Sequence, residues 1–416
     1  MIKKYFRILI KEIYYLLILL PKINILNKRI AKNNKNNIIP IIIDCELSTL
    51  NQYLEPVVEE LLKLNYCKFE FYFGEIIKGA GSSYSGYNKN NIFSVKLYKY
   101  LKGDMIFLSP HIYPKGPLSA LKIIFDHAIC SAKFSHHPIE YYLNYNIYCI
   151  TGKLYEEKIK NILNNFSINN LKLRNVGYPK SDKLFNNKTL SRNNILSKLN
   201  LDPNKKNILY APSWEEGLSA REFGLQLTEI ILNNKDINLI IKFHPCFFVS
   251  KIDKNYQFYT GNINWDLIFS KFNKYSNYKF IKDFKIDDLL FISDIMITDL
   301  SSVALEFLAL EKPVIYLDCP KFETTFSSLY KSYNDLSYSE LLLDPKSNAG
   351  RHVGHVNYDY NTINDDINFI INNPDYKINE RKEYSELLLS NKGISSKTCA
   401  DMIVEEFNNY IIKKNN

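Results

Sequence analysis

A strand-to-turn pattern in the second half of the chain carries the side chains best suited to phosphate chemistry. An apolar run ends at Thr298, the polar turn Asp299-Leu300-Ser301-Ser302 follows, and a helical pattern begins at Ser302. The first N–H groups of a helix are unpaired and lie at its positive end, so this turn is a candidate site for donor phosphates. Asp and Ser also cap helices, which explains the same residues without a ligand.

Glu306 lies one turn into the predicted helix, on the side from which its carboxylate would reach a ribose hydroxyl. The alternative is a solvated helix residue. With Asp299, Ser301 and Ser302 it makes up the predicted nucleotide and phosphate site of this turn.

Two more polar turns follow apolar runs in the same half. Pro245 biases His244 to an extended conformation, which presents its imidazole at the sheet edge. In its protonated form His244 would neutralise a leaving phosphate, together with Lys242. Ser213 is expected to donate to a phosphate, and Trp214 either lines a base pocket or belongs to the core.

The first half offers a candidate base, His127, directly after Asp126 at the end of another apolar run. A histidine oriented by a carboxylate has a pKa near working pH, as proton abstraction from an acceptor hydroxyl requires. His136 and His137 follow, but adjacent side chains diverge and no spaced acidic partner is evident. We therefore predict neither a metal site nor a cofactor.

The elements that position these residues alternate between apolar strands and helical patterns, which is typical of βαβ units and parallel sheets. Ligands in such sheets bind beyond the carboxyl ends of the strands. Expected strands span 38–44, 67–73, 104–108, 122–125, 148–151, 207–211, 238–243, 295–298 and 313–317. Expected helices span 50–64, 153–163, 219–232, 286–292, 302–310, 379–389 and 395–410.

A chain of 416 residues with 46% hydrophobic residues is long enough for two cores. We expect an α/β fold with two Rossmann-like domains facing each other, their parallel sheets flanked by helices. The predicted division is a basic amphipathic N-terminal region at 1–36, an acceptor domain at 37–188 and a donor-nucleotide domain at 189–416.

The formal charge of +9 favours anionic partners, although a general bias toward Lys and Asn accounts for part of it. Lys and Arg form no dense block with interleaved aromatics, so we predict no nucleic-acid partner. Seven scattered cysteines without a CxxC pair suit a reducing cytoplasm. The basic, apolar segment 1–22 is expected either to rest on the inner face of a membrane or to pack on the protein itself.

In order along the chain, these motifs resemble the CDP-glycerol glycerophosphotransferase family of teichoic-acid and capsule enzymes. The resembling segments are 176–182 (VGYPKSD), 209–214 (LYAPSW), 242–245 (KFHP), 294–316 and 392–396 (KGISS).

The resemblance implies a glycosyltransferase-B-like fold and transfer of a polyol phosphate from a CDP-alcohol to a membrane-linked acceptor, with loss of CMP. It implies that His244, Ser301 and Ser302 hold the phosphates and that His127 acts as base. His127 departs from the family's His-Gly pair, because Ala128 follows it, and residues 322–351 show little similarity.

Alternatives remain open at this point. A glycosyltransferase of the same fold would use a nucleotide-sugar donor and release a nucleoside diphosphate rather than CMP. A sugar-nucleotide epimerase shares the architecture but would show a denser set of acidic and basic catalytic residues. A noncatalytic nucleotide- or glycan-binding scaffold would bind without turnover.

Overall fold

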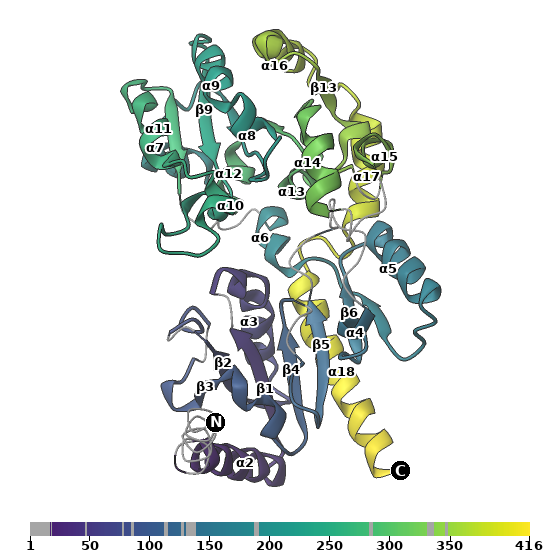
Figure 1. Cartoon of the computed structure of the whole chain (residues 1–416). Helices are drawn as coiled ribbons and strands as arrows, with labels where there is room; N and C mark the ends of the chain where they lie inside the picture. Colours follow the sequence, from purple (N-terminus) through teal and green to yellow (C-terminus); the bar gives the residue numbers. More distant parts are fainter. Residues whose placement is uncertain are drawn as a thin grey trace.

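The structure, a computed structural model, consists of two lobes that each contain one parallel sheet between helices (Figure 1). It describes residues 17, 19–45, 48–76, 79–84, 87–111, 115–125, 129, 139–186, 191–282, 286–330, 337–345 and 348–416. This arrangement confirms the predicted fold class.

The first sheet has seven strands in the order β3-β2-β1-β4-β5-β6-β7. Its strands are β1 (Ile38–Cys45), β2 (Lys68–Glu75), β3 (Ile92–Ser94), β4 (Met105–Ser109), β5 (Ala120–Phe125), β6 (Ile147–Ile150) and β7 (Lys172–Asn175). Ile41, Ile42 and Ile43 of β1 are completely buried, as continuous apolar strands are when helices cover both faces of a parallel sheet.

The second sheet has six strands in the order β10-β9-β8-β11-β12-β13. They are β8 (Lys206–Tyr210), β9 (Ile237–Lys242), β10 (Tyr278–Ile281), β11 (Ile295–Thr298), β12 (Val314–Leu317) and β13 (His355–Asn357). The strand order reverses between β8 and β11, and between β1 and β4 in the first sheet. Such switch points are where parallel sheets open a crevice for ligands.

The helices of the first lobe are α2 (Leu20–Lys35), α3 (Glu55–Lys63), α4 (Ile139–Tyr142) and α5 (Lys153–Asn165). Those that follow are α6 (Asp182–Phe185), α7 (Arg192–Leu199), α8 (Ser219–Glu222), α9 (Gly224–Leu232), α10 (Tyr256–Thr260), α11 (Trp265–Ser270), α12 (Asp287–Ile292), α13 (Val303–Leu308), α14 (Lys321–Tyr330), α15 (Tyr338–Leu343), α16 (Ile363–Asn372), α17 (Ile378–Leu388) and α18 (Ser395–Asn415).

The C-terminal helix α18 returns from the second lobe and packs along the first (Figure 1). Its Met402, Ile403 and Phe407 are buried in the same core as β1 and α3. Glu406 pairs with Lys172 and Arg174 of β7. The predicted division assigned residues 395–416 to the second domain because they follow it in the sequence. The packing instead places this helix against the first sheet.

The N-terminal region is described from α2 onward, apart from Leu17 and Leu19. α2 buries Ile23, Leu26 and Ile30 against the first lobe, and Asn34 hydrogen-bonds the backbone at Asp104. The described part of the predicted amphipathic region is therefore a helix that covers the protein's own core. Most of segment 1–22 lies outside the described residues. Among those that are described, no helix is long and apolar enough to span a bilayer.

Gly177, in the VGYPKSD segment, lies where the two lobes join and has a φ of +87°. A Cβ there would stand 2.3 Å from both the Ser390 carbonyl oxygen and the Ser395 Oγ. We expect Gly177→Ala to lower the free energy of unfolding by about 2–4 kcal/mol, measured by urea denaturation. Gly79→Ala is the matched control, because Gly79 has a φ of +84° but open space around its Cβ. Equal losses in the two variants would show that backbone strain, not crowding, is responsible.

Candidate phosphate-binding site

Three adjacent strands of the second sheet end at the predicted phosphate residues. In register, Tyr210 of β8 lies between Ile241 of β9 and Ile297 of β11. Ser213, His244 and Leu300 each follow three residues after these positions, and Ser301 comes next. Because the strands are parallel, Ser213, His244 and the Ser301-Ser302 turn emerge from the same sheet edge, beside the switch point.

Asp299 ties two of these turns together. Its Oδ1 accepts from the backbone N–H of Ser213 at 2.9 Å and of Leu300 at 2.7 Å. Its Oδ2 accepts from the Ser219 backbone N–H at 3.2 Å and from the Ser219 Oγ at 2.7 Å. Thr298 adds a bond from its hydroxyl to the Ala211 carbonyl.

This geometry gives Asp299 a structural role, and its predicted place in the nucleotide and phosphate site stays a prediction. Its side chain is 1% exposed, and its two oxygens hold the loop at 212–219 against the turn before α13. A carboxylate offers no donor to a phosphate and repels its charge. Asp299 is therefore a positioning residue that sets where Ser213 lies relative to Ser301 and Ser302.

We expect Asp299→Asn to reduce the free energy of unfolding by about 2 kcal/mol. Both carboxylate oxygens of Asp299 accept hydrogen bonds, and the amide nitrogen of Asn, itself a donor, would replace one of them. Asp202→Asn is the control: Asp202 is exposed, and the bond described for its side chain is a local one from the Asn204 backbone N–H. Urea denaturation measures both variants. A loss below 0.5 kcal/mol, roughly the scale of ordinary surface substitutions, would show that the Asp299 network does not hold the loop.

His244 is exposed and is the N-cap of a short 3-10 turn at Pro245–Phe248. Its ψ of 142° is extended, as the following proline dictates. The Nδ1 accepts from the Cys246 backbone N–H at 3.2 Å, which leaves the Nε2 as the protonated nitrogen of the neutral ring. An Nε2–H at this edge is a hydrogen-bond donor for an anion. Lys242 is buried at the end of β9, with its Nζ 3.3 Å from the Phe243 carbonyl oxygen.

Ser301 is partly buried and Ser302 is exposed, directly before α13. The carbonyls of both serines accept the first bonds of the helical turn, from Ala304 and Leu305. Ser213 is 4% exposed, at the neighbouring loop. Phosphate contacts by Ser213, Ser301, Ser302, Lys242 and His244 remain predictions that this placement allows.

Glu306 does not point into solvent. Its carboxylate accepts from the Lys180 Nζ at 3.0 Å and 2.8 Å, across the boundary between the lobes. Asp287 of α12 lies 3.7 Å from the same ammonium and 2.7 Å from the Lys183 Nζ. The rings of Tyr53 and Tyr178 lie 5.4 Å and 6.0 Å from Lys180. The ribose contact of Glu306 stays a prediction, while the ion pair was not foreseen.

Lys180 remains charged in this buried setting. Burial acts to lower its pKa, but Glu306, Tyr53 and Asp287 together raise the pKa above the ordinary lysine value. The pair joins the first lobe to α13, the helix that begins at the Ser301-Ser302 turn. The pair therefore ties the first lobe to the helix that follows that turn.

The first lobe holds a buried polar cluster at its own switch point, which sequence reasoning missed. Asp44 at the end of β1 accepts from the Tyr98 hydroxyl at 2.9 Å and lies 3.4 Å from the His111 Nε2. Ser109, the last residue of β4, donates to Asp44 at 3.2 Å. The signal was present, because Asp44, Ser109 and His111 each stand at or just after the end of an apolar strand.

Asp126 and His127, the predicted base and its partner, lie outside the described residues, as do His136 and His137. β5 ends at Phe125, directly before them. Within the described ranges, no three His, Cys, Asp or Glu side chains come together as metal ligands.

The family model of CDP-glycerol:poly(glycerophosphate) glycerophosphotransferases matches residues 131–337. A teichoic acid glycerol-phosphate transferase of Staphylococcus aureus is 30% identical over 176 residues, which cover 41% of this chain and 42% of that protein. A teichoic acid glycerol-phosphate primase of Bacillus subtilis is 30% identical over 165 residues, 38% of this chain and 37% of that protein. The matches thus span less than half of these relatives.

Solved structures share the fold over nearly the whole chain. The wall teichoic acid polymerase TagF matches with a TM-score of 0.59 at 14% identity, covering 98% of both chains. Staphylococcus aureus MnaA, in a co-structure with UDP, matches with a TM-score of 0.55 at 11% identity, covering 90% of this chain and 97% of that one. The polar turns described above lie within the matched segment 131–337. Over that segment, the chain is similar to the CDP-glycerol:poly(glycerophosphate) glycerophosphotransferase family.

Proposed function

We propose that this protein transfers glycerol phosphate, or a closely related polyol phosphate, from a CDP-activated donor to a hydroxyl of a cell-surface polymer precursor. The observation that carries the proposal is the convergence of Ser213, His244 and the Ser301-Ser302 turn at one sheet edge. The family match covers these residues. A related TagF structure was obtained from a variant soaked with CDPG, which supports CDP-glycerol as the donor.

In the proposed reaction the acceptor oxygen attacks the β-phosphorus of the donor. A new phosphorus–oxygen bond forms as the bond to the bridging oxygen breaks, and CMP leaves with the electron pair. His127, oriented by Asp126, takes the hydroxyl proton. Fixed positive groups at the leaving phosphate are where such transfer gains most, because charge develops there.

The donor side of this scheme uses the second lobe. The His244 Nε2–H, the Lys242 ammonium and the N–H groups at Ser301 and Ser302 would bind the two phosphates. Asp299 fixes the spacing between the Ser213 loop and that turn. The acceptor would lie against the first lobe, and we propose that it is a membrane-linked glycan or polyol phosphate at the cytoplasmic face.

The test is the identity of the released nucleotide. Purified protein, CDP-glycerol and a glycerol-phosphate oligomer are incubated, and nucleotides are separated by ion-exchange chromatography. The proposal predicts stoichiometric CMP and an oligomer longer by one glycerol phosphate. Turnover of a nucleotide sugar with release of a nucleoside diphosphate would favour the glycosyltransferase alternative. Nucleotide binding without any turnover would favour the noncatalytic scaffold.

A further inference from the structure

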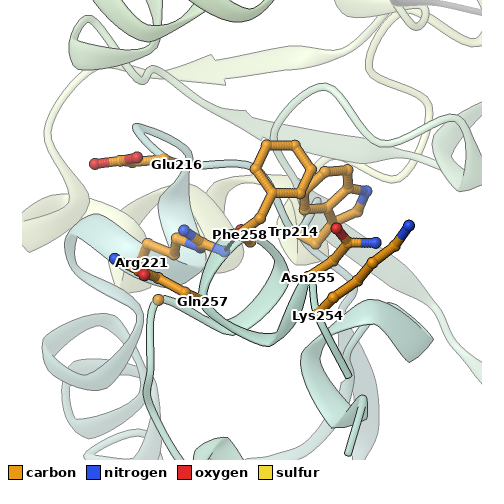
Figure 2. Close-up of a pocket in the computed structure, with 8 residues that line it drawn as sticks. Trp214, Glu216, Arg221, Lys254, Asn255, Gln257 and Phe258 are labelled. Carbon is orange, nitrogen blue, oxygen red and sulfur yellow. Dashed lines mark hydrogen bonds between the residues drawn. The ribbon is translucent and has the colours of Figure 1, made fainter. Parts of the chain in front are cut away.

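A cavity of about 560 Å³ opens next to the loops that carry Ser213 and His244. Figure 2 shows side chains from three segments around it: the loop after β8, helix α8, and α10 with the stretch that leads into it. Its lining is mixed in character and comprises Trp214, Glu216, Arg221, Lys254, Asn255, Gln257, Phe258 and Gly261.

Internal bonds fix the walls of this cavity. The Arg221 Nη2 donates to the Phe258 carbonyl at 2.9 Å and also to the Tyr259 carbonyl, so the guanidinium anchors α10 to α8. The Trp214 ring meets the Phe258 ring edge-on, with centroids 5.3 Å apart. The Trp265 indole N–H holds the end of α10 through the Thr260 carbonyl at 2.9 Å.

The chemistry of the lining suits a hydroxyl-rich anion. Lys254 and Arg221 supply positive charge for a phosphate, and the amides of Asn255 and Gln257 can donate to and accept from hydroxyl groups. Trp214 and Phe258 provide apolar surface for a carbon skeleton. A purely apolar ligand would offer no partner to the Lys254 ammonium or to the amides, which is costly for any of them that it desolvates.

The cavity adjoins the predicted phosphate site through Trp214. Trp214 directly follows Ser213, and Lys254 lies ten residues after His244 in the segment continuing from the same turn. A ligand in the cavity would therefore meet the loop that carries Ser213. The lining is also exposed: Phe258 retains 48% of its surface and Lys254 is exposed, whereas a base pocket would enclose a flat ring. A chain that continues beyond the cavity fits this openness.

We propose that the cavity binds a phosphodiester unit of the acceptor, a polyol phosphate one or more units away from the attacking hydroxyl. This inference rests on the proposed function and adds to it the place where the growing chain is held. Lys254 would contact the phosphate, and Phe258 and Trp214 would pack on the carbon skeleton between phosphates.

The experiment is calorimetry with two probes, a soluble tri(glycerol phosphate) and CMP. The double variant Lys254→Gln/Phe258→Ala removes one charge and one ring from the cavity. The matched control is Lys251→Gln/Ile252→Ala, which removes one charge and one large apolar side chain from exposed neighbours outside the lining. We expect the cavity variant to weaken trimer binding about tenfold or more, the usual scale for a lost charged hydrogen bond, with CMP binding unchanged.

Unchanged trimer binding in the cavity variant would overturn the inference, as would an equal loss in the control. A parallel loss of CMP binding would also overturn it, because the cavity would then belong to the nucleotide. The proposed function fails separately, if the wild-type protein binds neither CMP nor CDP-glycerol. Selective loss of trimer binding would uphold the cavity assignment even then.

Discussion

Replacing Lys180 with methionine is expected to lower the free energy of unfolding by about 3–5 kcal/mol, because it leaves the buried Glu306 carboxylate without its cation. Lys180 is 5% exposed, and both Glu306 oxygens accept from its ammonium. Asp287, whose carboxylate lies 3.7 Å from the same ammonium, would then repel Glu306, and of these lysines only Lys183 would remain to offset the two carboxylates. Urea denaturation followed by circular dichroism gives the loss.

Two further variants show whether charge is the cause. Lys180→Met combined with Glu306→Gln removes both charges and should recover most of the loss, since a neutral amide is cheaper to bury than a carboxylate. Lys183→Met removes a half-exposed lysine that pairs with Asp287, and should cost less than about 1 kcal/mol. If Lys180→Met costs no more than Lys183→Met, the interlobe ion pair does not stabilise the fold.

The second large effect is on catalysis. His244→Ala is expected to reduce kcat for CMP release by about 10²–10³-fold, the range seen when one donor to a developing charge is removed. Its stability should change little, because His244 is exposed and its imidazole accepts a local bond from the Cys246 backbone N–H.

The control for His244→Ala is His355→Ala, a histidine of the edge strand β13 that pairs with Asp366 at 2.9 Å. It removes an imidazole from the same lobe without touching the three convergent turns. Initial rates at saturating CDP-glycerol compare the two variants. Near-normal kcat for His244→Ala would remove His244 from the proposed leaving-group site.

Elements whose local pattern and packing agree could be predicted from the sequence. β11 was expected at 295–298 and spans those residues, since four buried apolar or β-branched residues stand between polar turns. The three-residue strands β3 and β13 were missed, because such short edge segments carry no recognisable period. α17 and α18 were expected within a few residues of their bounds, although α18's return to the first lobe was not.

Some residues of the candidate site could likewise be predicted from the sequence, and others could not. The turns at Ser213, His244 and Ser301 could be located because each ends an apolar strand, and their common edge follows from parallel topology. The partner of Glu306 could not, since Lys180 is 126 residues away and only the joining of two lobes brings them together. The structural role of Asp299 was missed. An Asp just before a helix gives the same sequence pattern whether its carboxylate faces a ligand or a neighbouring loop.

We propose that the second lobe binds a cytidine donor through the Ser301-Ser302 turn. Calorimetry of CDP-glycerol, CMP and UDP with the wild type and with Ser302→Ala tests it most directly. We predict that the cytidine ligands bind more tightly than UDP, and that Ser302→Ala, which removes one hydroxyl donor, weakens CDP-glycerol several-fold, about what the loss of one hydrogen bond gives. A preference for UDP, or affinity for CDP-glycerol that Ser302→Ala leaves unchanged, would contradict the claim.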